Sequence, residues 1–519
     1  MRPKPNRFLV ALVAAIFVAG CASDGNKSKV TPARQDLVIG ASADTFNTTG
    51  DKANLGMFPF NANIFEGLVR ATPTYQVEPA LAERWAYRGN NTWRFFLRKG
   101  VTFHNGAAFN AAAVKFSLDR LTRSGVGTIK LGPDSTKVID DFTVDITPAV
   151  PDLRLVDQLT HPSVAPMIAP GTEPGTNPVG TGPFKFVSYT KGDRLVVERY
   201  DGYWGAAAKL KTLTFRFIPD DNTRWLAFKT GSVDLIYDLP RQLLGEARKT
   251  PGVEAVLGPP GAAEIMDLNR SGAPPYDLLG DLALRKAVAM AIDRKTLVDR
   301  VFLGSAEVSN TITPAALLGP SASLVTGVAH DTKAAEAMLD SAGWKVGPDG
   351  VRVKDGHRLS LTIINGYPPI DLRKPMPELV QAELKDVGID SKIVETPELA
   401  TYSARLDKGE GDIFMERVAQ NDTSPTQFAA GFYYSKASPP YSKWFSAGPG
   451  FDSLLEGALA TPDRAEADKL TAEALREAVD RQVVVIPVAA VNWLWAMKPG
   501  IQGFVGAARH VRWAPVSWK

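Results

Sequence analysis

Two short motifs could together carry out acyl-transfer chemistry. Ser188 and Lys191 have the Ser-x-x-Lys spacing in which a lysine activates a serine nucleophile, and Lys229-Thr230-Gly231 matches a second motif of such enzymes. A catalytic Ser-x-x-Lys begins a helix, whereas residues 184–199 have the pattern of two paired strands. A serine hydrolase therefore stays an alternative function, and the sequence context predicts a hairpin around Ser188.

Histidines and carboxylates are not spaced as metal ligands. The five histidines are far apart, at His104, His161, His330, His357 and His510. No His-Glu-x-x-His pair, Gly-x-Ser-x-Gly elbow or phosphate-binding Gly-x-x-x-x-Gly-Lys motif occurs in the sequence. Asp140-Asp141 and Asp220-Asp221 lie in turn-like sequence beside predicted strands. We therefore predict no catalytic residues, no metal site and no cofactor.

Aromatic residues gather in the last quarter of the chain. They include Tyr433, Tyr434, Tyr441, Trp444, Trp493 and Trp495. Aromatic surfaces suit a ligand cleft, although most such residues are core residues. We keep Trp493 as a candidate ligand-binding residue.

Hydrophobic periodicity predicts both strands and helices. Strands are predicted at residues 36–41, 92–98, 184–187, 194–199 and 483–495. Helices are predicted from Asn110 through Leu121, from Leu284 through Val298, over residues 333–342, and from Thr461-Pro462 through Val479. Residues 359–364, 377–387 and 389–394 predict a strand, a helix and a strand, which is the βαβ unit of an α/β fold.

Length and charge limit the classes of protein to consider. The 519 residues exceed what one hydrophobic core usually organises, so two lobes are expected. Three of the 59 basic residues lie in a predicted leader, which leaves 56 against 56 acidic residues. This balance argues against nucleic acid as a partner.

The N-terminus has the pattern of a lipoprotein leader. Residues 1–20 combine a basic start, an apolar run from Phe8 to Val18 and small residues before Cys21, which predicts a signal peptide. Val18-Ala19-Gly20-Cys21 resembles a bacterial lipobox, so Cys21 is predicted to be lipidated, with palmitate among its acyl chains. Residues 21–34 are polar and predict a flexible tether. Cys21 is the only cysteine, so no internal disulfide can form.

Several separated segments resemble solute-binding protein family 5, the dipeptide, oligopeptide and nickel receptors of ATP-driven importers. Matching blocks are Ile64 to Val69, Pro79 to Trp85, Thr92 to Gly106, Val179 to Phe184, Tyr203-Trp204, Lys229 to Asp234, Arg285 to Arg294 and Leu339 to Trp344. They occur in the family's order over nearly the whole mature chain. His104 belongs to one of these blocks, so we expect it to have a packing or hydrogen-bonding role.

The resemblance implies an α/β, two-lobed, periplasmic-binding-protein-like fold of type II, in the large class with an extra N-terminal subdomain. It places lobe I at residues 31–270 plus 486–519, with the extra subdomain at about 60–175. Lobe II is placed at residues 271–485. The chain would then cross a hinge twice, near Ile265 to Asn269 and near Val485 to Asn492.

The resemblance also points to candidate ligand-binding residues. In peptide-binding relatives, a lobe II loop carries a carboxylate that pairs with the ligand's α-amino group. Here Val418 and Asn421 replace its tryptophan and first aspartate, and a neutral Asn does not balance a buried ammonium. Asp422 is the neighbouring carboxylate that could take over, or it could cap the turn at Pro425.

Three further residues complete the predicted ligand site. Arg417 could bind a carboxylate or phosphate, or form a salt bridge with Glu416 or Asp412. Tyr367 and Asn47 follow predicted strands and are placed to reach the cleft.

These observations predict an extracytoplasmic, monomeric lipoprotein that is held at the cell membrane by its lipid. It would capture a peptide or peptide-like solute between two lobes and deliver it to an ABC permease. Two alternatives stay open: an extracytoplasmic serine hydrolase using Ser188 and Lys191, and a sensor or scaffold of the same fold.

Overall fold

The computed structural model describes residues 34–43, 63–124, 129–161, 166–172, 178–366, 375–420, 422–507 and 511–519. The chain divides into two units, Met1–Arg34 and Gln35–Lys519. The predicted signal peptide, Cys21 and the predicted tether as far as residue 33 lie outside the described residues.

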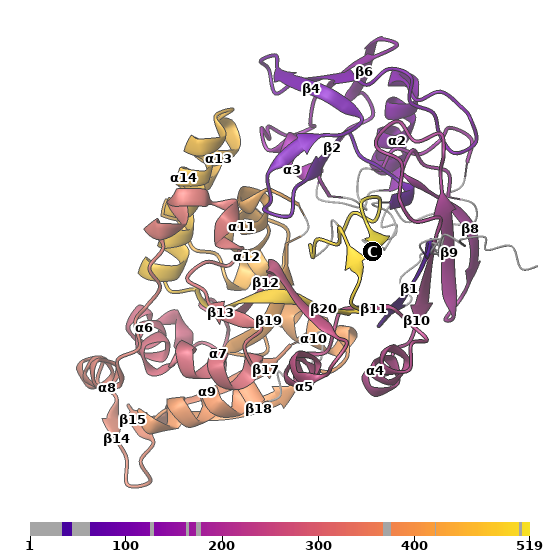
Figure 1. The fold of residues 1–519 in the computed structure, drawn as a ribbon. Coiled ribbons are helices and arrows are strands. Elements are labelled where there is room, and N and C mark those ends of the chain that lie inside the picture. The colour runs from indigo at the N-terminus through magenta and orange to yellow at the C-terminus, as the bar shows by residue number, and fades with distance from the viewer. Residues whose placement is uncertain are drawn as a thin grey trace, which may run out of the picture. The chain divides into compact units, whose positions relative to one another are not determined.

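One large sheet organises the second unit (Figure 1). Its strands follow in the order β18 (Asp390–Glu395), β17 (Ser360–Asn365), β19 (Ile413–Ala419), β12 (Glu254–Leu268), β20 (Val485–Met497), β11 (Leu235–Tyr237), β1 (Asp36–Ala41), β10 (Thr212–Phe217), β9 (Arg194–Arg199) and β8 (Phe184–Thr190). β13 (Ala306–Val308) pairs with β20 off this path.

The two long strands β12 and β20 form the middle of this sheet. β20 is apolar and buried along its length except at Asn492 and Trp493, which are half-buried. It pairs antiparallel with β12, and the register shifts between Leu257 and Ala262. Both segments predicted to cross the hinge lie at this ladder, one at the end of β12 and one in β20. The lobe boundaries themselves stay a prediction.

β11, on one side of the β12–β20 ladder, and β19, on its other side, both end near the middle of the ladder. β11 is antiparallel to β20 and ends with Tyr237 opposite Trp495. β19 is antiparallel to β12 and ends with Ala419 opposite Ala262, which in turn lies opposite Val491. The carboxyl ends of β11 and β19 therefore approach each other on either side of Asn492 and Trp493. We call residues 257–262 and 491–495 the convergence region.

A separate four-stranded sheet belongs to the predicted extra subdomain. It has the order β4 (Ala82–Tyr87), β5 (Trp93–Leu97), β7 (Thr143–Ile146) and β6 (Thr136–Asp140). The predicted alternation in β5 is confirmed, because Trp93, Phe95 and Leu97 are buried. Helix α2 (Ala111–Ser124) packs beside it and is capped as predicted, since Asn110 Oδ1 accepts a 3.1 Å hydrogen bond from the Ala113 N–H.

Two predicted helix boundaries are wrong. The single helix expected from Leu284 to Val298 is α6 (Leu282–Ala291) followed by α7 (Arg294–Phe302), because Asp293 leaves helical geometry and caps α7. The last long helix is α14 (Arg464–Arg476), capped by Asp463 rather than by Thr461. In both cases an aspartate accepts from an N–H three residues later and fixes the start.

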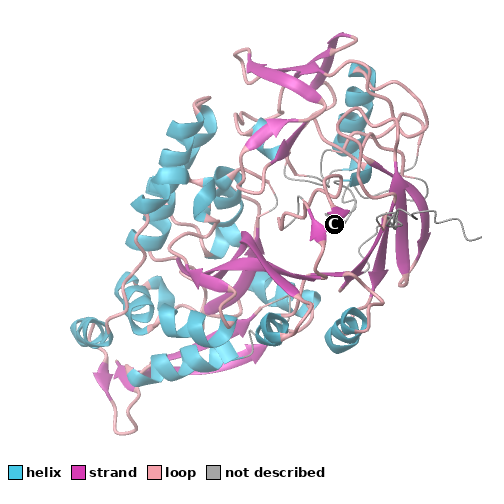
Figure 2. Cartoon of the chain, viewed as in Figure 1, coloured by secondary structure: helices cyan, strands magenta, loops and turns pink. Residues whose placement is uncertain are grey.

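The predicted βαβ unit is confirmed, with α9 (Pro375–Asp386) between the parallel strands β17 and β18. Figure 1 and Figure 2, which share one view, show that most helices lie on the side of the large sheet where α6 to α14 are labelled. The other helices are α3 (Leu155–Gln158), α4 (Asp221–Lys229), α5 (Leu244–Lys249), α8 (Thr332–Ser341), α10 (Leu399–Lys408), α11 (Pro425–Tyr433), α12 (Tyr441–Trp444) and α13 (Pro449–Ala460). Small pairings join β2 (Val69–Ala71) to β3 (Val77–Pro79), β15 (Arg352–Lys354) to β14 (Lys345–Val346) and β16 (His357–Arg358), and β21 (Ile501–Gln502) to β22 (Ser517–Trp518).

No helix in the described ranges is both long enough and apolar enough to cross a membrane.

Candidate functional site

The predicted ligand residue Arg417 lies near the end of β19, beside the convergence region. Its Nε lies 2.9 Å from Glu264 Oε2, and the Glu264 side chain is fully buried. The predicted salt bridge to Glu416 or Asp412 is therefore wrong. Glu264 is the cross-strand neighbour of Arg417 in the β12–β19 pair, which the sequence did not reveal.

The other two candidate partners of Arg417 are engaged elsewhere. Glu416 accepts from the Tyr441 hydroxyl at 2.9 Å. Asp412 accepts from the Thr362 N–H at 2.7 Å, and burial raises its pKa to about 7.

Asp422 is buried in the turn that begins α11. Its Oδ1 accepts hydrogen bonds from the Ser424 N–H at 2.8 Å and from Gln420 Nε2 at 3.3 Å. Burial raises the pKa of Asp422 to about 7, and the neighbouring carboxylates Asp157 and Asp152 add to this effect. The geometry matches the turn-capping alternative, because one carboxylate oxygen is committed to the turn.

Asp422 belongs to a contact between distant segments, which we call the acidic contact: residues 152–161 against 422–427 and 464–468. The Thr423 hydroxyl donates to Asp157 Oδ1 at 2.9 Å, and the Thr423 N–H donates to Thr160 Oγ1 at 3.2 Å. Arg464 Nη1 lies 2.5 Å from Asp157 Oδ1. The contact joins the predicted extra subdomain to the predicted lobe II.

Trp493 lies in the convergence region with a half-buried ring. Its Nε1 is buried and has no hydrogen-bond partner among the described residues. The side chain of its neighbour Asn492 already has a hydrogen-bond partner, because Nδ2 donates to the Gly258 carbonyl at 2.7 Å. The Nε1 atoms of Trp93, Trp444, Trp495 and Trp513 are likewise buried without a partner among the described residues, so Trp493 stays a candidate by its position in the convergence region.

Asn47, Tyr367 and Asn421 lie outside the described residues. Among the predicted ligand residues that are described, Arg417 and Trp493 lie at the central ladder, and Asp422 lies in the acidic contact.

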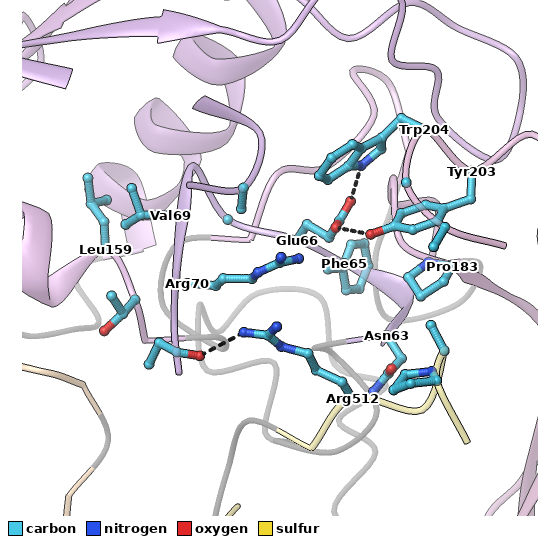
Figure 3. Close-up of a pocket in the computed structure, with 18 of the residues that line it drawn as sticks. Asn63, Phe65, Glu66, Val69, Arg70, Leu159, Pro183, Tyr203, Trp204 and Arg512 are labelled. Atoms are coloured by element: carbon cyan, nitrogen blue, oxygen red, sulfur yellow. Dashed lines mark hydrogen bonds between the residues drawn. The ribbon is translucent and has the colours of Figure 1, made fainter. Parts of the chain in front are cut away.

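Sequence reasoning missed a pocket of about 400 Å³ (Figure 3). β2, the segment after α3, residues 203–206 and residues 512–515 contribute to its wall. All of these lie within the predicted lobe I, so the pocket is not formed between the two predicted lobes.

A buried carboxylate forms one wall of this pocket. Glu66 accepts hydrogen bonds from the Tyr203 hydroxyl at 2.8 Å, from Trp204 Nε1 at 2.8 Å and from the Thr181 hydroxyl at 2.9 Å. Burial raises the pKa of Glu66, and the three hydrogen bonds oppose that rise. The network fixes both aromatic rings at the pocket wall.

Two arginines, Arg70 and Arg512, also line the pocket. Arg70 Nε lies 2.6 Å from Glu78 Oε1, and Arg512 donates to the same oxygen. Desolvation alone would raise the pKa of Glu78, but the two arginines lower it overall. Burial and the charge of Arg70 lower the pKa of Arg512. These shifts show that two positive charges share one carboxylate.

Two contacts place the pocket beside the regions described above. Thr160, a residue of its wall, accepts from the Thr423 N–H next to Asp422. The β2–β3 hairpin contributes Arg70 to the wall. In the same hairpin, the Tyr75 hydroxyl donates to the Pro260 carbonyl of β12 at 2.8 Å. The pocket therefore borders the acidic contact, and the hairpin beside it reaches the convergence region.

His104 has the hydrogen-bonding role that was predicted. The Gly180 N–H donates to Nδ1 at 3.3 Å, and Nε2 lies 2.9 Å from the Gly182 carbonyl. This pattern fits a neutral ring with its proton on Nε2. Burial lowers the pKa of His104 to about 4, which agrees with the neutral form.

The serine motif lies in the predicted hairpin. Ser188 is exposed on β8, and Lys191 is in the turn before β9. Neither residue is at the start of a helix, which a Ser-x-x-Lys enzyme requires. Within the described residues, no group of three or more His, Cys, Asp or Glu side chains could hold a metal ion.

The chain belongs to the bacterial extracellular solute-binding proteins of family 5, whose model matches residues 76–440. It is a family 5 binding protein of the ABC-importer type, and members of this family are extracytoplasmic. The predicted periplasmic-binding-protein-like α/β fold is confirmed.

Particular relatives have different ligands in their names. The chain is 28% identical over 497 residues to the nickel-binding periplasmic protein of Escherichia coli K12, covering 89% of this chain and 92% of that protein. It is 27% identical over 469 residues to the glutathione-binding protein GsiB of Salmonella choleraesuis, covering 85% and 86%. The crystal structure of NikA from Brucella suis with Fe(III)-EDTA superposes with a TM-score of 0.81 at 26% identity, covering 93% of this chain and 100% of that one.

Proposed function

We propose that this protein captures a peptide or peptide-like solute between its two predicted lobes and hands it to an ABC permease. The observation that carries the proposal is the convergence of β11 and β19 on Trp493 from opposite flanks of one sheet. In open α/β sheets, ligands bind outside the carboxyl ends of strands. Trp493 offers a partly exposed indole side chain at that position.

Closure over the solute supplies the signal to the permease in this proposal. A solute that touches both lobes stabilises the closed form by its additional contacts, and the permease binds that form. The protein acts as a monomer and does not alter the solute chemically. A micromolar dissociation constant needs about 8 kcal/mol, which a buried cleft with several hydrogen bonds can supply.

Titration of the purified full chain tests the proposal. Dipeptides, glutathione, opines and nickel chelates are added while tryptophan fluorescence is followed, because the chain has 10 tryptophans. We expect one class to give a saturable change with micromolar affinity. Trp493→Phe should weaken that binding several-fold, whereas the control Trp344→Phe, in a core cluster of the predicted lobe II, should not. If no compound changes the fluorescence or the melting temperature, the peptide assignment is wrong.

We further propose that Cys21 carries the lipid that holds the protein at the cell membrane. The lipobox-like sequence before Cys21 and the polar residues after it support this anchor. In a bacterial host, the parent chain should partition into detergent with the added mass of acyl chains. Cys21→Ser should leave the chain in the aqueous phase, and equal partitioning of both would refute lipidation.

A further inference from the structure

We infer that the pocket between β2 and residues 512–515 is an anion subsite, where Arg70 and Arg512 bind a carboxylate of the solute. This inference rests on the proposed function, because it names the chemistry at one end of the captured solute. The subsite lies in the predicted lobe I and includes neither Arg417 nor Asp422.

The hydrogen-bonding capacity of the two arginines exceeds what the described residues use. Each guanidinium has five N–H donors. Both donate to the same oxygen of Glu78, and Arg512 also donates to the Ala71 carbonyl at 3.3 Å. Their side chains are 38% and 39% exposed, so N–H donors are left for a ligand. Figure 3 shows the two guanidinium groups close to each other.

The charge of the pocket favours an anion. Glu78 is shared by two arginines, so its single negative charge can balance the charge of only one of them. Glu66 is the carboxylate in the pocket wall and lies within reach of the Arg70 charge, but both of its oxygens accept from neutral donors, Thr181, Tyr203 and Trp204. Burial also raises the pKa of Glu66, which reduces its compensation of the arginine charges. A bound carboxylate would complete the pairing that the protein leaves incomplete.

The size and the neighbours of the pocket fit one end of a larger solute. Small-molecule sites usually have volumes of about 300–1,000 Å³, and this pocket has about 400 Å³. Phe65, Tyr203 and Trp204 supply an apolar and aromatic wall beside the arginines. Since Thr160 bonds to Thr423 across the acidic contact, a solute in the pocket would lie beside the loop that carries Asp422.

Substitution of each arginine separates ligand binding from a purely structural role. The probe is glutathione, compared with its diethyl ester, in which the carboxylates are capped. In titration calorimetry of the full chain we expect Arg70→Gln and Arg512→Gln each to weaken glutathione binding at least 10-fold. The control Arg481→Gln, an exposed arginine paired with Glu477, should leave the affinity unchanged. The ester should bind the parent chain at least 10-fold more weakly than glutathione.

A second probe keeps the test independent of the solute. Succinate at millimolar concentration should raise the melting temperature of the parent chain and of Arg481→Gln, but not that of Arg70→Gln or Arg512→Gln. If no peptide-like solute binds but succinate acts in this pattern, the proposed function fails and the anion subsite stands. Equal glutathione affinity in all variants, or equal succinate stabilisation of all of them, would overturn the subsite.

Discussion

The pocket and the acidic contact both bury carboxylates, but they compensate them differently. In the pocket, Glu66 is surrounded by three neutral donors, and the nearby arginines keep N–H groups to spare. In the acidic contact, Asp152, Asp157, Asp422 and Asp468 lie close together, and each has a raised pKa because of burial. The pocket is therefore built to receive an anion, whereas the acidic contact is built to respond to protons.

The largest expected effect comes from breaking the Glu66 network. Glu66→Ala leaves the Tyr203, Trp204 and Thr181 donors without their acceptor and opens a cavity. We expect a loss of about 3 kcal/mol in the free energy of unfolding, measured by urea denaturation. The control Glu83→Ala, with a side chain 55% exposed, should change it by less than about 0.5 kcal/mol. Equal small losses would show that the network does not stabilise the fold.

Removing the arginine of the acidic contact should lower the free energy of unfolding by less than removing Glu66 does. Arg464→Ala deletes the partner of Asp157 and the donor to the Thr423 carbonyl at 3.2 Å. The Arg464 side chain is 32% exposed, so water replaces part of what is lost, and we expect a cost of about 2 kcal/mol. Hydrogen exchange of residues 152–161 should rise with this variant and stay unchanged with Lys469→Ala on the same helix. Unchanged exchange in Arg464→Ala would contradict the assigned role.

Protons should stabilise the acidic contact. The pKa of Asp422 is raised from 3.8 to about 7, so the folded chain binds its proton more tightly than the unfolded chain does. The stabilisation is full below pH 3.8 and is lost as the pH rises to about 7. This single group can contribute a slope of up to about 1.4 kcal/mol per pH unit.

Urea denaturation between pH 4 and pH 8 measures this slope. Asp422→Asn should flatten the curve, whereas Asp407→Asn, on the exposed side of α10, should not. A curve for Asp422→Asn that is parallel to that of the parent chain would show that Asp422 is not the responding group.

The smallest effect is expected outside both regions. Ser188 is exposed on β8, so Ser188→Ala should change the free energy of unfolding by less than about 0.5 kcal/mol. The affinity for the solute should not change. A nitrocefin-like substrate should not be turned over by the parent chain. Turnover that is abolished in Ser188→Ala would restore the hydrolase alternative.

Local patterns predicted much of the fold. β1 was predicted with its observed ends, and β5 with its buried face, because both depend on residues that are adjacent in sequence. The break between α6 and α7 was missed because the apolar spacing continues across Asp293, and only the backbone geometry shows the new cap. Periodicity reports which face is buried, but it does not report where the helix axis changes.

The candidate site was harder to predict, because its parts meet only after folding. The partner of Arg417 is set by the register of β12 against β19, and no local motif records that register. Arg70 and Arg512 meet at Glu78 although they lie at opposite ends of the chain. Glu66 and Tyr203-Trp204 were visible as family blocks, but their spacing gave no sign that they bond to each other.

The paired strands β12 and β20 limit how this protein can move. Flanks joined by two adjacent strands cannot tumble independently, as they would on a flexible linker, so relative motion has to bend or twist the ladder. Such a restraint leaves less orientational freedom to be lost on ligand capture, which favours affinity. The register of the ladder shifts between Leu257 and Ala262 and again between Glu264 and Ile265, beside the predicted hinge segment Ile265 to Asn269, and we expect the flexure at these irregular positions.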